Sequence, residues 1–233
     1  MTRQASADAN APRLCGFAQR IEHRLLLGCI AITLALVGFA ALASEAREGD
    51  ISAIDRTLLL VFRVRGDLAV PVGPLWVQES ARDVSALGGF TVLTLVSIFA
   101  TVMLLMQGRR LQAPVFAGAV ILTEAASEGF KYLIARPRPV LVPYLDLVYS
   151  SSFPSGHAMM SPVVYLTLAA VLAAAFESRR VRLLLLCSAI FLVVAVGITR
   201  VYLGVHWPTD VLAGWAMGSA IALAASYVLL RAA

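Results

Sequence analysis

Charge is scarce in this chain of 233 residues, in which charged residues make up only 14% and hydrophobic residues 60%. A soluble domain has about 25% charged and roughly 45–50% apolar residues. Of the 19 basic residues, a single one is lysine, Lys131, and all the others are arginine. So little charge cannot cover a water-facing surface. This excludes an ordinary soluble protein and predicts that a lipid bilayer is the solvent of the chain.

Cysteine and histidine are rare as well, with three residues of each. Cys15, Cys29 and Cys187 are an odd number, and two of them lie in apolar runs. We therefore expect buried small side chains rather than disulfides. Residues 41–43 are similar to a signal-peptidase site, so a cleaved leader over residues 1–43 is an alternative. Because a polar stretch precedes an apolar core of span length, we expect an uncleaved first helix.

Six apolar stretches are each close to the roughly 20 residues that a membrane-spanning helix needs. They cover residues 25–43, 87–106, 112–134, 158–176, 183–199 and 210–230. We therefore predict an all-α, polytopic membrane protein with about six transmembrane helices. Residues 1–20 show no clear apolar periodicity, so we expect a flexible cytoplasmic tail followed by one membrane domain over residues 21–233.

The net charge of +5 lies in short connections rather than in one basic stripe, which argues against a nucleic-acid partner. Arginines gather before the first span and in the connections at residues 109–110 and 179–182. By the positive-inside rule, these segments and both termini are cytoplasmic, while the loops 44–86, 135–157 and 200–209 are outside. This topology predicts a bacterial inner-membrane protein whose outer loops face the periplasm.

The loop over residues 44–86 has apolar residues at helical spacing between charged ones, from Ile51 to Phe62. This pattern predicts a short amphipathic helix that lies on the outer membrane interface. Trp76, beyond a Pro- and Gly-containing break, is typical of an interfacial anchor.

The last span carries Gly214 and Gly218, a small-xxx-small pair that allows two helices to approach closely. We expect this pair to pack within the chain rather than to form a dimer. The oligomeric state predicted from the sequence is therefore a monomer or a weak dimer.

Cations gather at the outer ends of the spans, as Lys131, Arg138 and Arg200. Such residues at a membrane boundary are functional candidates, and a planar guanidinium can bind two phosphate oxygens at once. Ser155 and Gly156 precede the fourth span, where free backbone N–H groups favour an anion and glycine allows close approach. The alternating topology places all of them on one face, which predicts a phosphate-binding pocket at the membrane surface.

Two of the three histidines, His157 and His206, fall in the same cluster. Two imidazoles beside an anion site can divide a phosphoryl transfer, one attacking phosphorus and the other protonating the departing alkoxide. Asp210 follows His206 by four residues, and a helical turn begun at Pro208 would bring the two together. The carboxylate could then hold the imidazole tautomer and stabilise its charge.

No set of His, Asp and Glu residues has metal-ligand spacing, so we expect neither a metal nor another cofactor. The cations would do the work that metal ions do in other phosphoryl-transfer sites. Glu124 and Glu128 lie deeper in the third span on the helical face of Lys131. We expect these acids to pair with a basic residue rather than to act in catalysis.

Taken together, the three segments resemble the signature of the type 2 phosphatidic acid phosphatases. Lys-x6-Arg-Pro corresponds to Lys131, Arg138 and Pro139. Pro-Ser-Gly-His corresponds to Pro154, Ser155, Gly156 and His157. Ser-Arg-x5-His-x3-Asp corresponds to Arg200, His206 and Asp210, with Thr199 in place of the leading serine.

The resemblance implies a metal-independent phosphatase of about six helices that works through a phosphohistidine. It implies that His206 is the nucleophile, Asp210 its orienting partner and His157 the acid for the leaving group. The phosphate-binding residues that it implies are Lys131, Arg138, Ser155, Gly156 and Arg200, with Thr199, Pro154 and Pro139 in supporting positions.

The leading hypothesis is a lipid phosphatase whose partners are membrane lipids and whose substrate carries a terminal phosphate or diphosphate. Phosphatidate, phosphatidylglycerol phosphate, polyprenyl diphosphate and lipid A phosphate all fit this description. One alternative is a lipid phosphotransferase that passes the phosphate to another lipid. A second alternative is a non-catalytic membrane binder or transporter of anionic headgroups.

Overall fold

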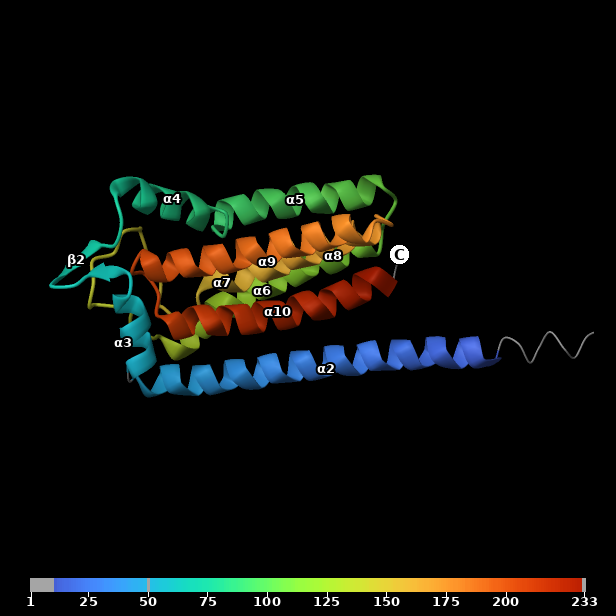
Figure 1. The fold of residues 1–233 in the computed structure, drawn as a ribbon, viewed down its shortest axis with the longest axis horizontal. Helices are drawn as coiled ribbons and strands as arrows, with labels where there is room; N and C mark the ends of the chain where they lie inside the picture. The colour runs from blue at the N-terminus through green and yellow to red at the C-terminus, as the bar shows by residue number, and fades with distance from the viewer. Residues whose placement is uncertain (1–10, 50, 232–233) are drawn as a thin grey trace, which may run out of the picture.

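The computed structural model of the chain describes residues 11–49 and 51–231 and shows a bundle of long, roughly parallel or antiparallel helices (Figure 1). The bundle consists of α2 (Ala11–Glu48), α5 (Phe90–Met106), α6 (Gln112–Ile134), α7 (Gly156–Ser161), α8 (Thr167–Ala174), α9 (Arg179–Tyr202) and α10 (Pro208–Arg231). The π-helical turn η1 (Pro162–Leu166) joins α7 to α8 into one long segment. These helices occupy the six apolar stretches of the sequence, so the predicted all-α membrane architecture is confirmed.

The number of spans differs somewhat from the six expected. Within the described residues, four helices are long and apolar enough to cross a membrane by themselves, namely the span part of α2, the α7–α8 segment, α9 and α10. A fifth results if α5 is taken together with α4 (Leu75–Ala86), to which it is bent by 41°. The helix α6 has 23 residues but falls outside this set, because acidic and basic residues interrupt its apolar sequence.

The outer surface of the bundle is apolar. In α2 only 6% of the span is buried within the protein, and Leu27, Leu34 and Phe191 are more than half exposed. Apolar side chains on this scale are stable only against lipid tails, which agrees with an integral membrane protein. Cys29 and Cys187 are free and exposed on this surface, so the expectation that they are buried was wrong. In a bilayer, an apolar sequence around a cysteine does not imply burial in protein.

A flexible tail over residues 1–20 is expected from the sequence. Residues 1–10 lie outside the described part of the chain, so the structure bears only on residues 11–20. Residues 11–20 are helical, because α2 already begins at Ala11. In the sequence, Leu14, Phe17 and Ile21 recur at three- and four-residue spacing and continue the pattern of the first span. The helix α2 therefore begins well before the first apolar stretch, which starts at residue 25.

The loop over residues 44–86 contains the predicted amphipathic helix, α3 (Ala53–Leu60), whose first turn is capped by the Ser52 hydroxyl. It also contains a hairpin that the sequence analysis missed, in which β1 (Arg63–Val64) pairs antiparallel with β2 (Asp67–Pro71). The turn between them uses Gly66 at a φ of +95°. In Figure 1, α3 and the hairpin cover one end of the bundle, which we call the α3 end.

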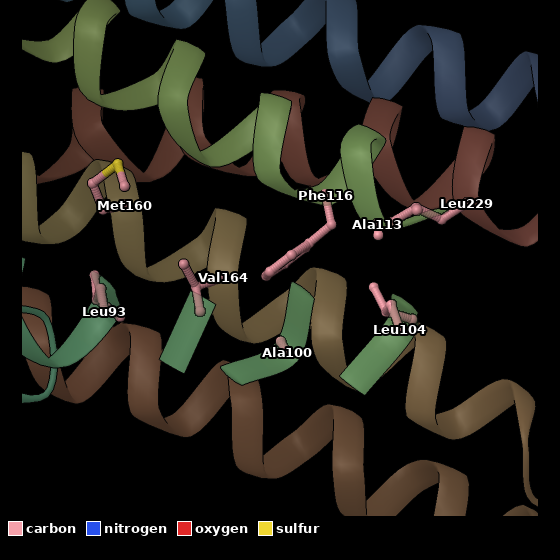
Figure 2. Packing of buried hydrophobic residues seen from close by; sticks show 8 residues of the cluster. All are labelled: Leu93, Ala100, Leu104, Ala113, Phe116, Met160, Val164 and Leu229. Carbon is pink, nitrogen blue, oxygen red and sulfur yellow. The ribbon is translucent and has the colours of Figure 1, made fainter. Parts of the chain in front are cut away.

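The core between α5, α6 and the α7–α8 segment is made of interlocking apolar side chains (Figure 2). Phe116 of α6, 1% exposed, lies in one cluster with Leu104 of α5 and Val164 of η1, and Leu93 extends this cluster along α5. This packing holds α5 and α6 side by side. The last residues of α6 and the first residues of α7 lie toward the α3 end.

The two glycines of α10 pack within the chain, as expected. A Cβ atom on Gly218 would lie 2.2 Å from the carbonyl oxygen of Met159, and one on Gly214 would lie 2.8 Å from that of Ser155. Only glycine permits this approach of α7 to α10. The contact places the first residues of α7 against the first turn of α10, where the motif residues lie.

Candidate active site

The motif segments, far apart in the sequence, meet at the α3 end of the bundle. They come from the end of α6, the loop after it, the start of α7, the end of α9 and the start of α10. A cavity of about 920 Å³ opens among them. The expected site residues that line this cavity are Lys131, Arg138, Gly156, His157, Arg200 and His206.

His206 lies in the loop between α9 and α10 and is 2% exposed. Its Nδ1 atom is 2.8 Å from the carbonyl oxygen of Ser152. A carbonyl oxygen can only accept a hydrogen bond, so Nδ1 must be the donor, and the lone pair of the neutral ring is therefore on Nε2. Nε2 lies 3.2 Å from Nη1 of Arg138, a donor that lines the cavity. The imidazole thus has a fixed tautomer.

Asp210, in the first turn of α10, lies beside His206, as their four-residue spacing suggested. Its Oδ2 atom is 3.5 Å from Nδ1 of His206, so the carboxylate supplies charge while the carbonyl of Ser152 takes the hydrogen bond. Oδ2 also accepts bonds from the Ser152 hydroxyl and from the backbone N–H of Trp207, the latter at 2.9 Å. The carboxylate and the carbonyl together hold the edge of the ring that carries Nδ1.

A buried ion network behind Asp210 was not predicted. Arg136 donates from Nη1 to Asp210 at 2.6 Å and from Nη2 to Asp55 at 2.8 Å. Asp55, on α3, is 0% exposed and also accepts from the backbone N–H and the hydroxyl of Thr209 at 2.8 and 2.7 Å. One arginine therefore bridges two buried carboxylates from distant parts of the chain. Buried charges are tolerated when they are paired and hydrogen-bonded in this way.

The three cations of the expected phosphate cradle all have partners within the described structure. Lys131 pairs with Glu128 at 2.7 Å, as expected for that acid. Arg200 donates to Asp146 and to the Ser85 hydroxyl, both at 2.6 Å.

Arg138 is held by backbone carbonyls, donating from Nε to Ser150 at 2.8 Å and from Nη1 to Val205 at 2.5 Å. Burial, and then the charge of Arg200, lower the pKa of Arg138 to about 10. It remains a cation at neutral pH. The partners of Arg200 could not be predicted, because Ser85 in α4 and Asp146 in the loop after α6 lie outside the motifs.

The start of α7 forms another wall of the site. Ser155 is the N-cap residue of α7 and is fully buried, and its hydroxyl has no hydrogen-bond partner within the described part of the chain. A Cβ atom on Gly156 would lie 3.5 Å from Nζ of Lys131, so a larger side chain would fill the space beside this cation. His157 lines the cavity and packs against Gly88. A Cβ atom at position 88 would lie 2.3 Å from the side chain of Val196, so the close packing beside His157 leaves no room for a larger residue there.

The remaining expected residues lie away from the cavity wall. The Thr199 hydroxyl donates to the carbonyl of Val196 at 2.7 Å, within its own helix. Pro154 and Pro139 are buried, and Pro154 follows a cis peptide bond. These three residues shape the backbone next to the site.

The electrostatics of the site favour a neutral, nucleophilic imidazole. Burial, together with the positive charges of Arg138 and Arg200, lowers the pKa of His206 to about 4, although Asp210 opposes the shift. A neutral imidazole with its lone pair on Nε2, beside cations that attract an anion and near a second imidazole, is suited to phosphoryl transfer. No group of three or more His, Cys, Asp and Glu side chains is placed to hold a metal ion within residues 11–49 and 51–231.

Two curated proteins are similar to this chain in sequence. Phosphatidylglycerophosphatase B from Bacillus subtilis is 42% identical over 92 residues, which cover 38% of this chain and 43% of that protein. An undecaprenyl-diphosphatase from Sulfolobus acidocaldarius is 32% identical over 111 residues, which cover 45% of this chain and 47% of that protein. The aligned region thus spans less than half the length of either relative.

Two solved structures share the fold. The transmembrane PAP2-type phosphatidylglycerolphosphate phosphatase from Bacillus subtilis superposes with a TM-score of 0.69 at 24% identity, over 88% of this chain and 96% of the other. LpxE from Aquifex aeolicus gives a TM-score of 0.52 at 24% identity, over 78% and 98%. The profile of the PAP2 superfamily matches residues 113–232, which is more than half of the chain and covers α6 to α10 almost completely. The chain is a membrane-embedded member of the PAP2 superfamily.

Proposed function

We propose that the protein is a membrane phosphatase that removes a terminal phosphate from a lipid through a phosphohistidine on His206. The observation that carries this proposal is the fixed tautomer of His206. Its Nδ1–H is bound to Ser152, and its Nε2 faces the cavity that three cations line. The two curated relatives described above are both named as phosphatases, one of phosphatidylglycerophosphate and the other of undecaprenyl diphosphate.

In the first half of the reaction, Nε2 of His206 attacks phosphorus and the bond from phosphorus to the ester oxygen breaks. His157, protonated at this stage, gives its proton to the departing oxygen. The phosphorylated imidazole is a cation, and Asp210 at 3.5 Å from Nδ1 stabilises its charge. Lys131, Arg138 and Arg200 neutralise the charge that develops on the phosphoryl oxygens.

In the second half, neutral His157 takes a proton from a water molecule, whose oxygen attacks phosphorus. The bond between phosphorus and Nε2 breaks, inorganic phosphate leaves, and His206 returns to its neutral form. The proton that His157 received is the one that it donates in the next cycle. Ser155, with a buried hydroxyl that has no partner within the described residues, would donate to a phosphate oxygen.

A lipid fits the cavity because its wall continues from the cations into the apolar part of the bundle. Phe90, Ile98, Val102 and Ile121 line the cavity and are also exposed on the outer surface of α5 and α6. The cavity therefore has an edge that borders the hydrocarbon region. A lipid could insert its phosphate among the cations while its chains remain between α5 and α6 and the bilayer.

The orientation follows from the arginines of the short connections. The connection between α5 and α6, which carries Arg109 and Arg110, and the start of α9 at residues 179–182 are at the end of the bundle opposite the α3 end. By the positive-inside rule this end is cytoplasmic, so both termini are inside and the cavity faces the periplasm of a bacterial inner membrane. Cysteine labelling at position 109 and at Tyr149 tests this topology, and labelling of position 109 from outside would reverse it.

The activity is tested with purified protein in detergent, by measuring phosphate release from phosphatidate, phosphatidylglycerol phosphate and a polyprenyl diphosphate, with and without EDTA. We expect release that EDTA does not reduce and that His206→Asn lowers by about 10³-fold or more. Asparagine keeps a donor for the Ser152 carbonyl but has no nucleophilic nitrogen. Acid-labile, alkali-stable label on the wild-type chain and none on the variant would identify the phosphohistidine.

The same experiment separates the alternatives. Transfer of labelled phosphate to an added lipid alcohol would show a phosphotransferase, whereas inorganic phosphate is the product of a phosphatase. Retention of normal release in both His206→Asn and His157→Gln would disprove the mechanism. Binding of headgroups without any release would leave a non-catalytic binder.

A further inference from the structure

The cavity extends from the cations along α5 and α6, away from the α3 end. One part of its wall is polar although it lies among the helices of the bundle. Thr94, Ser97 and Thr101 of α5 and Glu124 of α6 line this part. An acid inside a span is costly and by default marks a functional position. The proposed phosphatase chemistry uses none of these four residues.

Glu124 differs from its neighbour on the same helix. Glu128 pairs with Lys131 at 2.7 Å, whereas the carboxylate of Glu124 has no ion pair or hydrogen bond within the described residues. Glu124 is half-buried and borders the cavity. The expectation that both acids pair with a basic residue therefore holds for Glu128 and leaves Glu124 unexplained.

Ser97 provides an independent observation. It is 7% exposed and lines the cavity, and its hydroxyl has no partner in the described part of the chain. Its neighbour Thr101 satisfies its own hydroxyl by donating to the Ser97 carbonyl at 2.7 Å. A buried hydroxyl without a partner costs free energy unless something else bonds to it.

The two helices bring these groups to nearly the same depth. Thr94 lies 12 residues before Met106, the end of α5, and Glu124 lies 12 residues after Gln112, the start of α6. Ser97 is one turn deeper. Because side chains tilt toward the start of their own helix and the helices are antiparallel, the tilt brings Glu124 and Ser97 closer to one depth along the bundle, and both line the cavity.

The distance between Glu124 and the phosphate cradle determines how far from phosphorus a polar group on the lipid must lie to reach Glu124. Glu124 precedes Lys131 by seven residues on α6, which is about 10 Å at roughly 1.5 Å per residue. An extended chain advances about 1.2 Å per bond, so this distance corresponds to about eight bonds from phosphorus. Hydroxyl or amide groups this far along a lipid would reach Glu124.

We propose that Glu124 and Ser97 form a second polar subsite that binds a hydroxyl group on the lipid chain, about eight bonds from the phosphate. A hydroxyl on the third carbon of an acyl chain, attached beside the carbon that carries the phosphate, lies at this distance. It would donate to Glu124 and accept from Ser97. This subsite rests on the proposed function, because it selects among lipids whose phosphate occupies the cradle. It disfavours a polyprenyl chain, which has no group to offer Glu124.

The test compares two phosphatidates that differ only in a hydroxyl on the third carbon of the chain next to the phosphate-bearing carbon. Both are presented at the same mole fraction in the same detergent. We expect the ratio of kcat/KM for the hydroxylated over the plain lipid to be about 10-fold in the wild-type protein. In Glu124→Leu and in Ser97→Ala the ratio should fall to near one. Ser161→Ala is the matched control, because Ser161 is also buried and its hydroxyl has no partner among the described residues, but it lies outside the cavity wall.

A wild-type ratio near one, or a high ratio that persists in Glu124→Leu and Ser97→Ala, would overturn the subsite. If neither lipid releases phosphate, the proposed function fails. In that case the subsite is judged by the dissociation constants of the two lipids measured on His206→Asn. The ratio of these constants should again be about 10 and should disappear when Glu124→Leu is added.

Discussion

Arg136 and Asp210 form a buried ion pair of 2.6 Å, and the same guanidinium binds Asp55 of the surface helix α3 at 2.8 Å. His206, the nucleophile of the proposed reaction, is therefore held from two directions. The carbonyl of Ser152 fixes its hydrogen bond, while the network behind Asp210 fixes the carboxylate that faces its ring. Part of the support comes from a loop that carries none of the motif residues.

Replacement of Asp55 should reduce turnover without affecting substrate binding. In Asp55→Asn an amide NH2 faces Arg136, which loses one of its two carboxylate partners. We expect the free energy of unfolding to fall by about 3 kcal/mol, because one charge of a buried network stays uncompensated. We also expect kcat to fall by about 10-fold with little change in KM, since Asp55 does not border the cavity.

Steady-state kinetics and thermal unfolding in detergent measure both effects. Asp67→Asn is the control, because Asp67 is an exposed acid of the neighbouring hairpin. A rise in KM with normal kcat would assign Asp55 to substrate binding instead. Recovery of kcat in Asp55→Glu, which restores the carboxylate, would support the positioning role.

The pH dependence of stability should show the low pKa of His206. The folded protein keeps His206 neutral down to a pH of about 4, whereas the unfolded chain takes up the proton below about 6.5. The contribution of His206 to the free energy of unfolding is therefore fully present above about pH 7 and is lost as the pH falls from 6.5 to 4. The loss amounts to roughly 3 kcal/mol. In His206→Asn the fall in melting temperature over this range should be smaller, and equal slopes in the two proteins would contradict the assignment.

Removal of the acid that faces Arg200 should tighten the binding of phosphate analogues. Asp146 occupies a position on Arg200 that an incoming anion would take, at 2.6 Å. Asp146→Asn keeps an oxygen that can accept from the N–H of Leu147 but removes the competing charge. We expect inhibition by orthovanadate at concentrations lower by about 5-fold. Asp83→Asn, an exposed acid on α4 with no ion pair within the described structure, should leave the inhibition constant unchanged.

Closeness of α7 to α10 should make Gly218 intolerant of even a methyl group. In Gly218→Ala the new Cβ atom would lie 2.2 Å from the backbone oxygen of Met159, which cannot move without shifting α7. We expect a destabilisation of about 2 kcal/mol or more and a loss of activity. Gly118→Ala is the matched control, because a Cβ atom there meets nothing within 4 Å. It should be neutral or slightly stabilising, by up to about 1 kcal/mol.

The sequence was sufficient to predict most of the apolar helices and the motif residues that meet at the α3 end, because both follow from local patterns. A run of apolar residues identifies a helix in a membrane, and residues at helix ends on one face must meet. The Ser152 carbonyl could not be predicted as the direct partner of Nδ1, since every residue carries a carbonyl and only the fold selects one. The four-residue spacing correctly placed Asp210 near His206 but overestimated the directness of their contact.

Asp55 was missed because nothing in its neighbourhood distinguishes it from the other charges of an amphipathic helix. Its partner Arg136 lies 81 residues away, and the motif pattern at Lys131, Arg138 and Pro139 does not single it out. The hairpin at β1 and β2 was missed for a different reason. Its strands are short, and the turn at Gly66 lies in a charged stretch that has no alternating apolar pattern. Tertiary contacts of Arg63 with the end of α9, at 2.9 Å to the carbonyl of Tyr202, hold it in place.

The edge of the cavity between α5 and α6 determines whether the substrate concentration is expressed per volume of solution or per amount of lipid in the bilayer. Phe90 and Ile121 line the cavity and are largely exposed, so under the proposed function a lipid would reach His206 by lateral diffusion without leaving the bilayer. The encounter is then two-dimensional. KM becomes a mole fraction of lipid, and diluting the substrate with inert lipid slows the reaction, whereas diluting the whole suspension with buffer does not.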